Sequence, residues 1–172
     1  YLRLLLGLGG FAGFPRPLPG VVLEDYYLEH IVLCLSDGLL AQCGIDLDTH
    51  RGEIAAGNLS ALCDCPFVLG SAEDIGGRIG RGLLRSSGVS PVSKATSENV
   101  ETLLALCEQG VGACFCPENL LHTALSPEQL AHLHILPLCP EASYPICFGY
   151  LSRSYPWSVL SEFIRIAREQ TA

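Results

Sequence analysis

The stretch KATSENVETLLALCEQGVGACFCP, residues 94–117, has the pattern of a helix followed by a strand. Thr96 or Ser97 offers a hydroxyl cap, and acidic residues follow in the expected first turn. Gly110 predicts the helix end, and the apolar run before Pro117 predicts a buried strand. Apolar residues between them recur at helical spacing, at Val100, Leu103, Leu104 and Cys107. A helix that leads into a buried strand is typical of an α/β fold.

The same alternation continues on both sides of this stretch. Apolar runs predict strands at residues 3–8, 30–36, 67–69, 134–138 and 144–151. Start signals and amphipathic spacing predict helices at residues 71–88, 126–133 and 158–170. In the last helix, the residues expected to face inward are Val159, Phe163, Ile166 and Ala167. Strands that alternate with helices imply parallel strands joined by crossover helices.

Composition limits the possible functions. The chain has 172 residues, enough for one domain or two small lobes, and its 49% hydrophobic content opposes disorder. Its net charge is −8, which argues against direct nucleic-acid binding by this chain. No apolar run is long enough for a membrane span. The 9 cysteines, an odd number placed mainly in apolar runs, favour a reducing cytoplasm over a secreted disulfide framework.

Two strand-to-helix junctions carry small hydroxyl residues, at VLGSAED (68–74) and KATSENV (94–100). Ligands of open α/β sheets bind beyond the carboxyl ends of the strands, where helix N-termini offer unpaired N–H groups. The junctions therefore predict a site for a small anion such as a carboxylate. The alternative is simple helix capping, which uses the same residue types. The residues alone favour capping.

The cysteines occur twice as C-x-C, at 63–65 and 114–116, and not as the C-x-x-C of zinc or thioredoxin sites. Residues two apart in a strand share a face, so Cys114 and Cys116 are predicted to fill one core layer with Phe115 opposite. Core packing is also favoured for Cys63 and Cys65, and a redox sensor is the alternative. The 5 histidines form no metal motif, so neither a metal nor a cofactor is predicted. With no nucleophile and base to pair, an enzyme is not expected; a cysteine-based one is the remaining rival.

Residues 98–121, ENVETLLALCEQGVGACFCPENLL, resemble a segment of the LysR-type transcriptional regulators. That segment is a helix, then V-x-x-G-x-G, an apolar strand and a proline; Cys107 stands here where valine is usual. Further similar stretches follow the family's order: EHIVLCLS (29–36), LSALCDCPFVLG (59–70), GRGLLRSSGVSPV (80–92), HLHILPL (132–138) and CFGYLSRS (147–154). The resemblance covers most of residues 21–170.

This resemblance implies an α/β, type II periplasmic-binding-protein-like fold, with two Rossmann-like lobes joined by two crossover strands. Lobe I would comprise residues 1–33 and 147–172, and lobe II residues 38–142. The family's first ligand-contacting Ser/Thr of lobe I has no counterpart in this sequence. By position, the expected ligand-binding residues are Ser71 and Ala72 after the Phe67 strand, Thr96 and Ser97 before the lobe II helix, and Ser36 at the first crossover.

The implied function is that of an effector-binding regulatory domain of a bacterial transcription factor. A small, anionic metabolite would bind between the lobes and change DNA binding. The expected partners are the effector, a homodimer or tetramer of the domain, and DNA contacted only through an N-terminal winged helix-turn-helix that these residues do not contain. The expected location is the cytoplasm, without membrane contact. The alternatives are an extracytoplasmic solute-binding protein of a transporter and a cysteine-based redox sensor.

Overall fold

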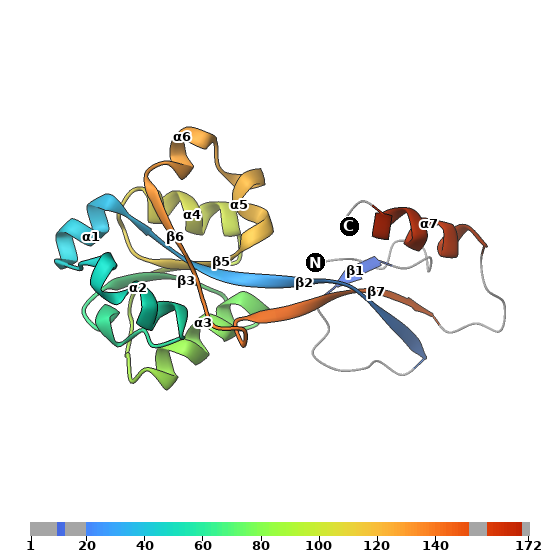
Figure 1. Ribbon diagram of the computed structural model, residues 1–172, viewed down its shortest axis with the longest axis horizontal. Helices are drawn as coiled ribbons and strands as arrows, with labels where there is room; N and C mark the ends of the chain where they lie inside the picture. The colour runs from blue at the N-terminus through green and yellow to red at the C-terminus, as the bar shows by residue number, and fades with distance from the viewer. Residues whose placement is uncertain (1–9, 13–19, 152–157, 170–172) are drawn as a thin grey trace. The chain divides into compact units, whose positions relative to one another are not determined.

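The computed structural model describes residues 10–12, 20–151 and 158–169 (Figure 1). The chain divides into two compact units: unit 1 comprises residues 1–29 and 144–172, and unit 2 comprises residues 30–143. The chain therefore passes from one unit to the other twice, once inside a long strand and once at the start of another. The strand predicted at residues 3–8 lies outside the described residues.

Unit 1 is built on three strands and a helix. The strands are β1 (Gly10–Ala12), the first part of β2 (Val21–Ser36) and β7 (Ser143–Leu151), and the helix is α7 (Ser158–Glu169). The order of these strands is β1-β7-β2, with β1 antiparallel to β7. At 16 residues, β2 is much longer than the predicted strand at 30–36, because its first part belongs to unit 1 and its second part to unit 2.

Helix α7 is anchored to β2 and β7 by polar and aromatic contacts. The Tyr26 hydroxyl donates a hydrogen bond of 3.2 Å to the Ala167 carbonyl, and the Phe163 ring meets Phe148 edge-on. The predicted inward face is nevertheless wrong for three of its four residues, which are exposed: Val159, Phe163 and Ile166. Ile164 is the buried residue of α7. Apolar spacing identifies a helix face, but burial depends on what packs against that face.

Unit 2 contains the remaining elements. Its helices are α1 (Asp37–Cys43), α2 (Leu47–Ala55), the 3₁₀ turn η1 (Ser60–Leu62), α3 (Ile75–Ser86), α4 (Val100–Glu108), α5 (Glu118–Ala124) and α6 (Pro127–Leu130). Its strands, besides the end of β2, are β3 (Pro66–Gly70), β4 (Val92–Ser97), β5 (Cys114–Pro117) and β6 (Leu133–Pro137). Most predicted elements of this region are therefore present, with boundaries shifted by a few residues.

The strands of unit 2 follow one another in the order β4, β3, β5, β2, β6. β3 is parallel to β4, and a parallel bridge between Phe67 and Ala113 joins β3 to β5. β2 is antiparallel to both β5 and β6. The predicted parallel arrangement is correct for β3 and β4 but wrong for β2. The handedness rule for crossovers does not apply to β2, because β2 enters from unit 1 and not from a crossover helix.

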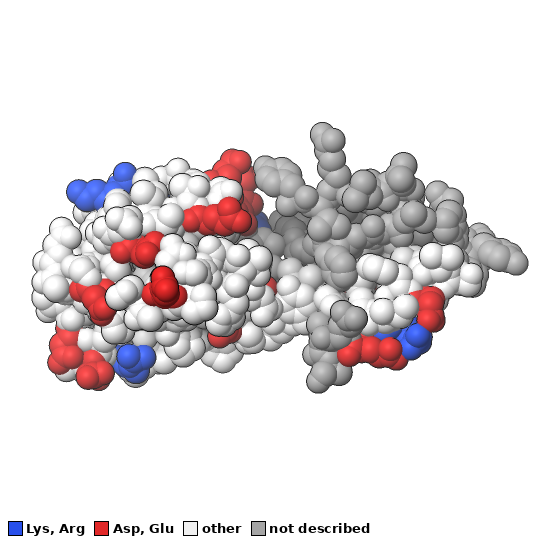
Figure 2. Space-filling model, turned by 90° about the horizontal axis from the view of Figure 1, so that it is seen from above, with Lys and Arg blue, Asp and Glu red and all other residues white. Residues whose placement is uncertain are grey.

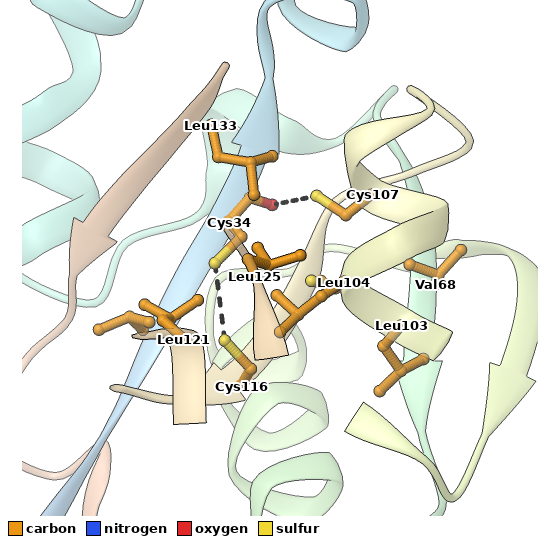
Figure 3. Packing of buried hydrophobic residues seen from close by; sticks show 11 residues of the cluster. Cys34, Val68, Leu103, Leu104, Cys107, Cys116, Leu121, Leu125 and Leu133 are labelled. Atoms are coloured by element: carbon orange, nitrogen blue, oxygen red, sulfur yellow. Dashed lines mark hydrogen bonds between the residues drawn. The ribbon is translucent and has the colours of Figure 1, made fainter. Parts of the chain in front are cut away.

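Helices cover both faces of these strands: α4 and α5 lie on one side and α2 and α3 on the other (Figure 1). Cys114 and Cys116 are buried on the α4 and α5 side, whereas the Phe115 ring points toward α3 and stacks on Phe67. This arrangement confirms that the two cysteines share one packed layer with Phe115 opposite. Figure 3 shows the layer, in which leucines surround the thiols; its labelled members include Cys34, Leu104, Cys107, Cys116, Leu121 and Leu125.

The glycines of α3 allow this helix to pack directly onto the strands. A Cβ on Gly77 would lie 2.1 Å from the Ser71 carbonyl oxygen, and a Cβ on Gly80 would lie 2.4 Å from the Phe115 ring. Both distances are far below van der Waals contact. Glycine lowers the stability of an isolated helix, but in α3 the absence of side chains at Gly77 and Gly80 allows the helix to lie close to β3 and β5.

Candidate functional site

The carboxyl ends of β3 and β4 lie side by side. In the parallel register, Leu69 is opposite Thr96 and Gly70 is opposite Ser97. Ser71 follows Gly70 directly, so the two predicted junctions meet at one edge of unit 2. Thr96 and Ala72 are exposed there, and Ser71 and Ser97 are half-buried. The structure therefore brings together four of the five predicted ligand-binding residues: Ser71, Ala72, Thr96 and Ser97.

The hydroxyl of Ser71 does not cap α3. Asp74 is the cap, and its Oδ2 accepts a hydrogen bond of 3.0 Å from the Gly77 N–H. The predicted helix start was three residues too early, because residues 71–74 form a turn in which the Asp74 N–H donates to the Ser71 carbonyl. The Ser71 Oγ accepts from the Glu73 N–H inside this turn. Ser71 is therefore part of the loop between strand and helix.

Neither Thr96 nor Ser97 caps α4. β4 continues through both residues, and Asn99 is the cap, with its Oδ1 accepting from the Thr102 N–H at 2.9 Å. The Ser97 Oγ accepts a local hydrogen bond from the Asn99 N–H at 3.1 Å. Within the part of the chain that the structure describes, the Thr96 hydroxyl has no hydrogen-bond partner. The capping interpretation, which the residues alone favoured, is wrong for this junction.

Ser36 lies elsewhere. Its Oγ caps α1 by accepting from the Leu39 N–H at 3.4 Å, and the residue is buried. The pairings of β5 place Ser71 level with Pro117 and therefore with Ile31. Ser36 is five residues farther along β2, about 16 Å away along the strand direction. The fifth predicted site residue is thus at the opposite edge, because β2 runs antiparallel to its neighbours.

The path of the chain makes the end of β3 a topological switch point. From β3 the chain enters α3, which lies on the Phe115 side. From β4 and β5, which flank β3, the chain enters α4 and α5 on the cysteine side. In open α/β sheets, neighbouring chains that leave to opposite faces create the place where ligands bind. The four grouped residues are at or beside this place.

A cation that sequence reasoning missed also reaches this edge. The Nη2 of Arg81, on α3, donates a hydrogen bond of 2.7 Å to the Gly70 carbonyl. Side chains of a helix point toward its N-terminus, so an arginine in the second turn of α3 can extend to the end of β3. Its position four residues after Gly77, on a face that packs against the strands, is the signal that could have identified it.

The LysR substrate binding domain family model matches residues 9–172. The chain belongs to this family. The family domain has the type II periplasmic-binding-protein-like fold, which agrees with the mixed α/β units described above. No curated protein matches the sequence.

Several solved structures are similar to this substrate-binding domain, and CbnR among them is a LysR family transcriptional regulator. The effector binding domain of QuiR in complex with shikimate has a TM-score of 0.64 and 12% identity, with 93% of this chain and 69% of that chain covered. The regulatory domain of CcmR from Synechocystis PCC6803, in complex with 2-PG, has a TM-score of 0.68 and 12% identity, with 94% and 72% covered. Full-length CbnR complexed with its target DNA has a TM-score of 0.61 and 18% identity, with 94% and 52% covered. The chain thus spans about half the length of the full-length regulator.

Four buried cysteines of this LysR-type domain lie near one another: Cys34, Cys107, Cys114 and Cys116. The Sγ atoms of Cys34 and Cys116 are 3.6 Å apart, and the Cys107 thiol donates to the Cys34 carbonyl at 3.2 Å (Figure 3). The pKa of Cys34 is lowered, mainly by its hydrogen bond with Cys114 and to a smaller extent by that with Cys116. The pKa of Cys114 is raised by hydrogen bonds with Cys107 and Cys34 and by burial. All four side chains are shielded from solvent, which supports the packing interpretation.

The C-x-C at 63–65 does not pack as a unit. Cys65 is buried, and burial is the main cause that raises its pKa to about 12. Cys63 is exposed. The prediction of core packing is therefore confirmed for Cys65 and wrong for Cys63, which directly follows η1.

The described part of the domain holds no cluster of three or more His, Cys, Asp or Glu side chains placed to bind a metal ion. Among the same residues, no helix is long and apolar enough to cross a membrane. The candidate site rests on the hydroxyl and amide groups at the carboxyl ends of β3 and β4, with Arg81 beside them.

Proposed function

We propose that this chain is the effector-binding part of a LysR-type transcriptional regulator, and that it senses a small anionic metabolite at the carboxyl ends of β3 and β4. The ligand contacts would be the backbone N–H groups and hydroxyls of Ser71, Ala72, Thr96 and Ser97. The domain binds its effector without converting it. Effector binding changes the population of states that bind DNA.

The observation that carries this proposal is the parallel register of β3 and β4. It aligns Gly70 with Ser97 and so brings the two predicted junctions to one edge. The caps of α3 and α4 are supplied by Asp74 and Asn99, so helix capping does not account for Thr96. A polar edge at a switch point, with hydroxyls that serve no cap, suits recognition of a small polar ligand.

Two structural neighbours support the class of ligand. QuiR is complexed with shikimate and CcmR with 2-PG, both small molecules. The complex of CbnR with its target DNA supports DNA as the partner of the whole regulator. We propose that DNA contacts come from a separate winged helix-turn-helix, that the domain forms homodimers or tetramers, and that the regulator works in the cytoplasm.

A screen of small metabolites by thermal shift tests the proposal. At least one compound is expected to raise the melting temperature of the wild-type domain by binding the folded state. The double variant Thr96→Val, Ser97→Ala is expected to weaken that compound by about tenfold or more, because each lost hydrogen bond to a ligand removes about 0.5–1.5 kcal/mol and more when the ligand is charged.

Ser93→Ala is the matched control. Ser93 is an exposed hydroxyl residue on β4 at the other end of the strand. The control is expected to bind the compound as the wild type does. Unchanged affinity in the Thr96→Val, Ser97→Ala variant would show that the effector binds elsewhere.

A further inference from the structure

The guanidinium group of Arg81 lies at the end of β3, where it contacts the Gly70 carbonyl. The Val68 N–H donates to the Ala113 carbonyl, and the Ala113 N–H donates to the Pro66 carbonyl. Backbone groups of residues 66 and 68 therefore point toward β5, and by the two-residue period of a strand so does the carbonyl of Gly70. The two strands are bridged at Phe67 and Ala113, and the Gly70 carbonyl accepts from Arg81. The strand residue that would lie opposite this carbonyl on β5 is Pro117, which has no N–H, so Arg81 supplies the donor that β5 lacks there.

The charge of Arg81 is not neutralised by the described residues. No carboxylate among them is within ion-pair distance of its guanidinium, although ion pairs elsewhere in the domain are resolved, such as Arg168 with Glu24. The Nε of Arg81 is buried and has no hydrogen-bond partner in the described part of the chain. An unpaired, half-buried cation and an unsatisfied donor are both unfavourable, so a structure retains them more readily where an anion binds.

An acidic group close to Gly70, the carboxylate of Asp74, is a helix cap. The Asp74 carboxylate caps α3 through the Gly77 N–H, and it lies close to Gly70, with Oδ2 3.7 Å from the position a Gly70 Cβ would take. This carboxylate is bound by the N-terminus of the helix and forms no ion pair with Arg81. Asp74 therefore does not pair with Arg81, and the charge of Arg81 stays available to a bound anion.

We propose that Arg81 is a ligand-contacting, specificity-determining residue, and that the effector places a carboxylate or phosphate between the ends of β3 and β5, against Arg81 and the Ser71 N–H. This inference rests on the proposed function, in which Thr96 and Ser97 hold the other end of the ligand. The two ends of the ligand are assigned in this way because β3 lies between β4 and β5. Arg81 is on the β5 side of β3, and the hydroxyls of Thr96 and Ser97 are on β4.

The test uses three probes and the whole 172-residue chain. The probes are inorganic phosphate, benzoate and benzamide; the last two match in shape and differ in charge. Each is titrated at constant ionic strength while the backbone N–H signals of Ser71, Ala72 and Ser97 are followed by nuclear magnetic resonance. Phosphate and benzoate are expected to shift these signals saturably in the wild type, and benzamide is expected to bind at least about tenfold more weakly.

The variants separate the charge of Arg81 from its packing. Arg81→Gln keeps a donor for the Gly70 carbonyl and is expected to weaken phosphate and benzoate about 10- to 100-fold, with benzamide unchanged. Arg81→Lys keeps the positive charge but lacks the planar guanidinium group. Its affinity for phosphate and benzoate is expected to lie between those of the wild type and Arg81→Gln. Arg85→Gln, which removes the same charge from an exposed position on α3, is expected to bind like the wild type. The dispersed spectrum of each variant reports whether it is folded.

Each other outcome contradicts a defined part of the inference. Equal anion binding by the wild type and Arg81→Gln would remove Arg81 from the site. Equal binding of benzoate and benzamide by the wild type would remove the preference for an anion, while the hydroxyl site of the proposed function would stand. Absence of saturable shifts with all three probes would overturn the inference itself. The proposed function is judged separately, by the metabolite screen and the Thr96→Val, Ser97→Ala variant.

Discussion

At the scale of single residues, two glycines or two cysteines close in sequence can have different surroundings, which the residue type alone does not predict. Gly80 and Gly82 are both in α3 and differ by two residues in sequence. A Cβ on Gly80 would meet the Phe115 ring, whereas a Cβ on Gly82 would have nothing within 4 Å. The same residue type therefore serves packing at one position and has no packing role at the other.

Alanine substitutions of these two glycines are expected to act in opposite directions. Gly80→Ala lowers the free energy of unfolding by about 1–3 kcal/mol, because Phe115 is buried and stacked on Phe67 and cannot move aside easily. Gly82→Ala raises it by about 0.5–1 kcal/mol, since alanine restricts the unfolded chain and favours the helix. Urea denaturation of both variants measures the difference. A stabilising Gly80→Ala would mean that α3 does not pack on β5 as described.

Cysteine burial makes a prediction for thiol labelling. Cys63 is expected to react fast with an alkylating reagent at neutral pH, because it is exposed. Cys65 is expected to react only after unfolding, because it is buried and a pKa of about 12 leaves almost no thiolate. Cys34 and Cys116 should be protected by burial alone. Peptide mass mapping after a short labelling pulse identifies the modified residues.

Cys63→Ser is the control for this experiment, and it should remove the fast phase of labelling. The same maps, taken before and after mild peroxide, test the redox alternative. A reversible disulfide between Cys34 and Cys116 that changes the oligomeric state would contradict the packing interpretation of the buried thiols. The 3.6 Å between their Sγ atoms makes this pair the one to examine.

At the scale of elements, the caps decide whether the candidate hydroxyls are free to bind a ligand. Asn99→Ala is expected to destabilise the domain by about 1 kcal/mol, because the Thr102 N–H loses its acceptor. Thr96→Ala should change stability by less than about 0.5 kcal/mol, since its exposed hydroxyl has no partner among the described residues. Chemical denaturation of both variants distinguishes them. A larger cost for Thr96→Ala would restore the capping interpretation and weaken the proposed site.

Local patterns predicted much of unit 2, and the failures have a common physical cause. Cys114 and Cys116 point to the same face of β5 because side chains alternate along a strand with a period of two, which is a local property. The direction of β2 in the sheet and the contact between Arg81 and Gly70 depend instead on tertiary contacts between separate segments of the chain. The apolar run at residues 30–36 predicts a strand without giving its direction, so the distance of Ser36 from the other four predicted site residues could not be recognised from sequence.

The candidate site was predictable to a similar extent. The two predicted strand-to-helix junctions are the signals that pointed to Ser71 and Thr96. Ser71 follows the apolar run of β3, whereas β4 has no such run and continues through Thr96 and Ser97. The exact caps, Asp74 and Asn99, were missed by two or three residues, since several capping residue types follow each strand. Sequence signals of this kind place a helix start within a turn, which is too coarse to tell a cap from a free hydroxyl.

At the scale of the whole molecule, the chain is acidic. Lys and Arg number 10 against 18 Asp and Glu. On the face that Figure 2 shows, acidic side chains are spread over the described surface of unit 2 and basic side chains are few. A cation such as Arg81 inside an acidic surface is better suited to selecting one small anion than to holding a polyanion, because DNA binding requires many cations together.

The 172-residue chain is therefore expected to show no binding to random duplex DNA, even at low salt where non-specific binding is strongest. Fluorescence anisotropy of a labelled duplex measures this, with salt varied to detect counterion release. The proposed effector should not create such binding, because one small anion adds negative charge to an already acidic domain. Binding that falls steeply with salt would show that a cationic surface exists on the domain itself. DNA recognition would then have to be assigned to the effector-binding part and not to a separate helix-turn-helix.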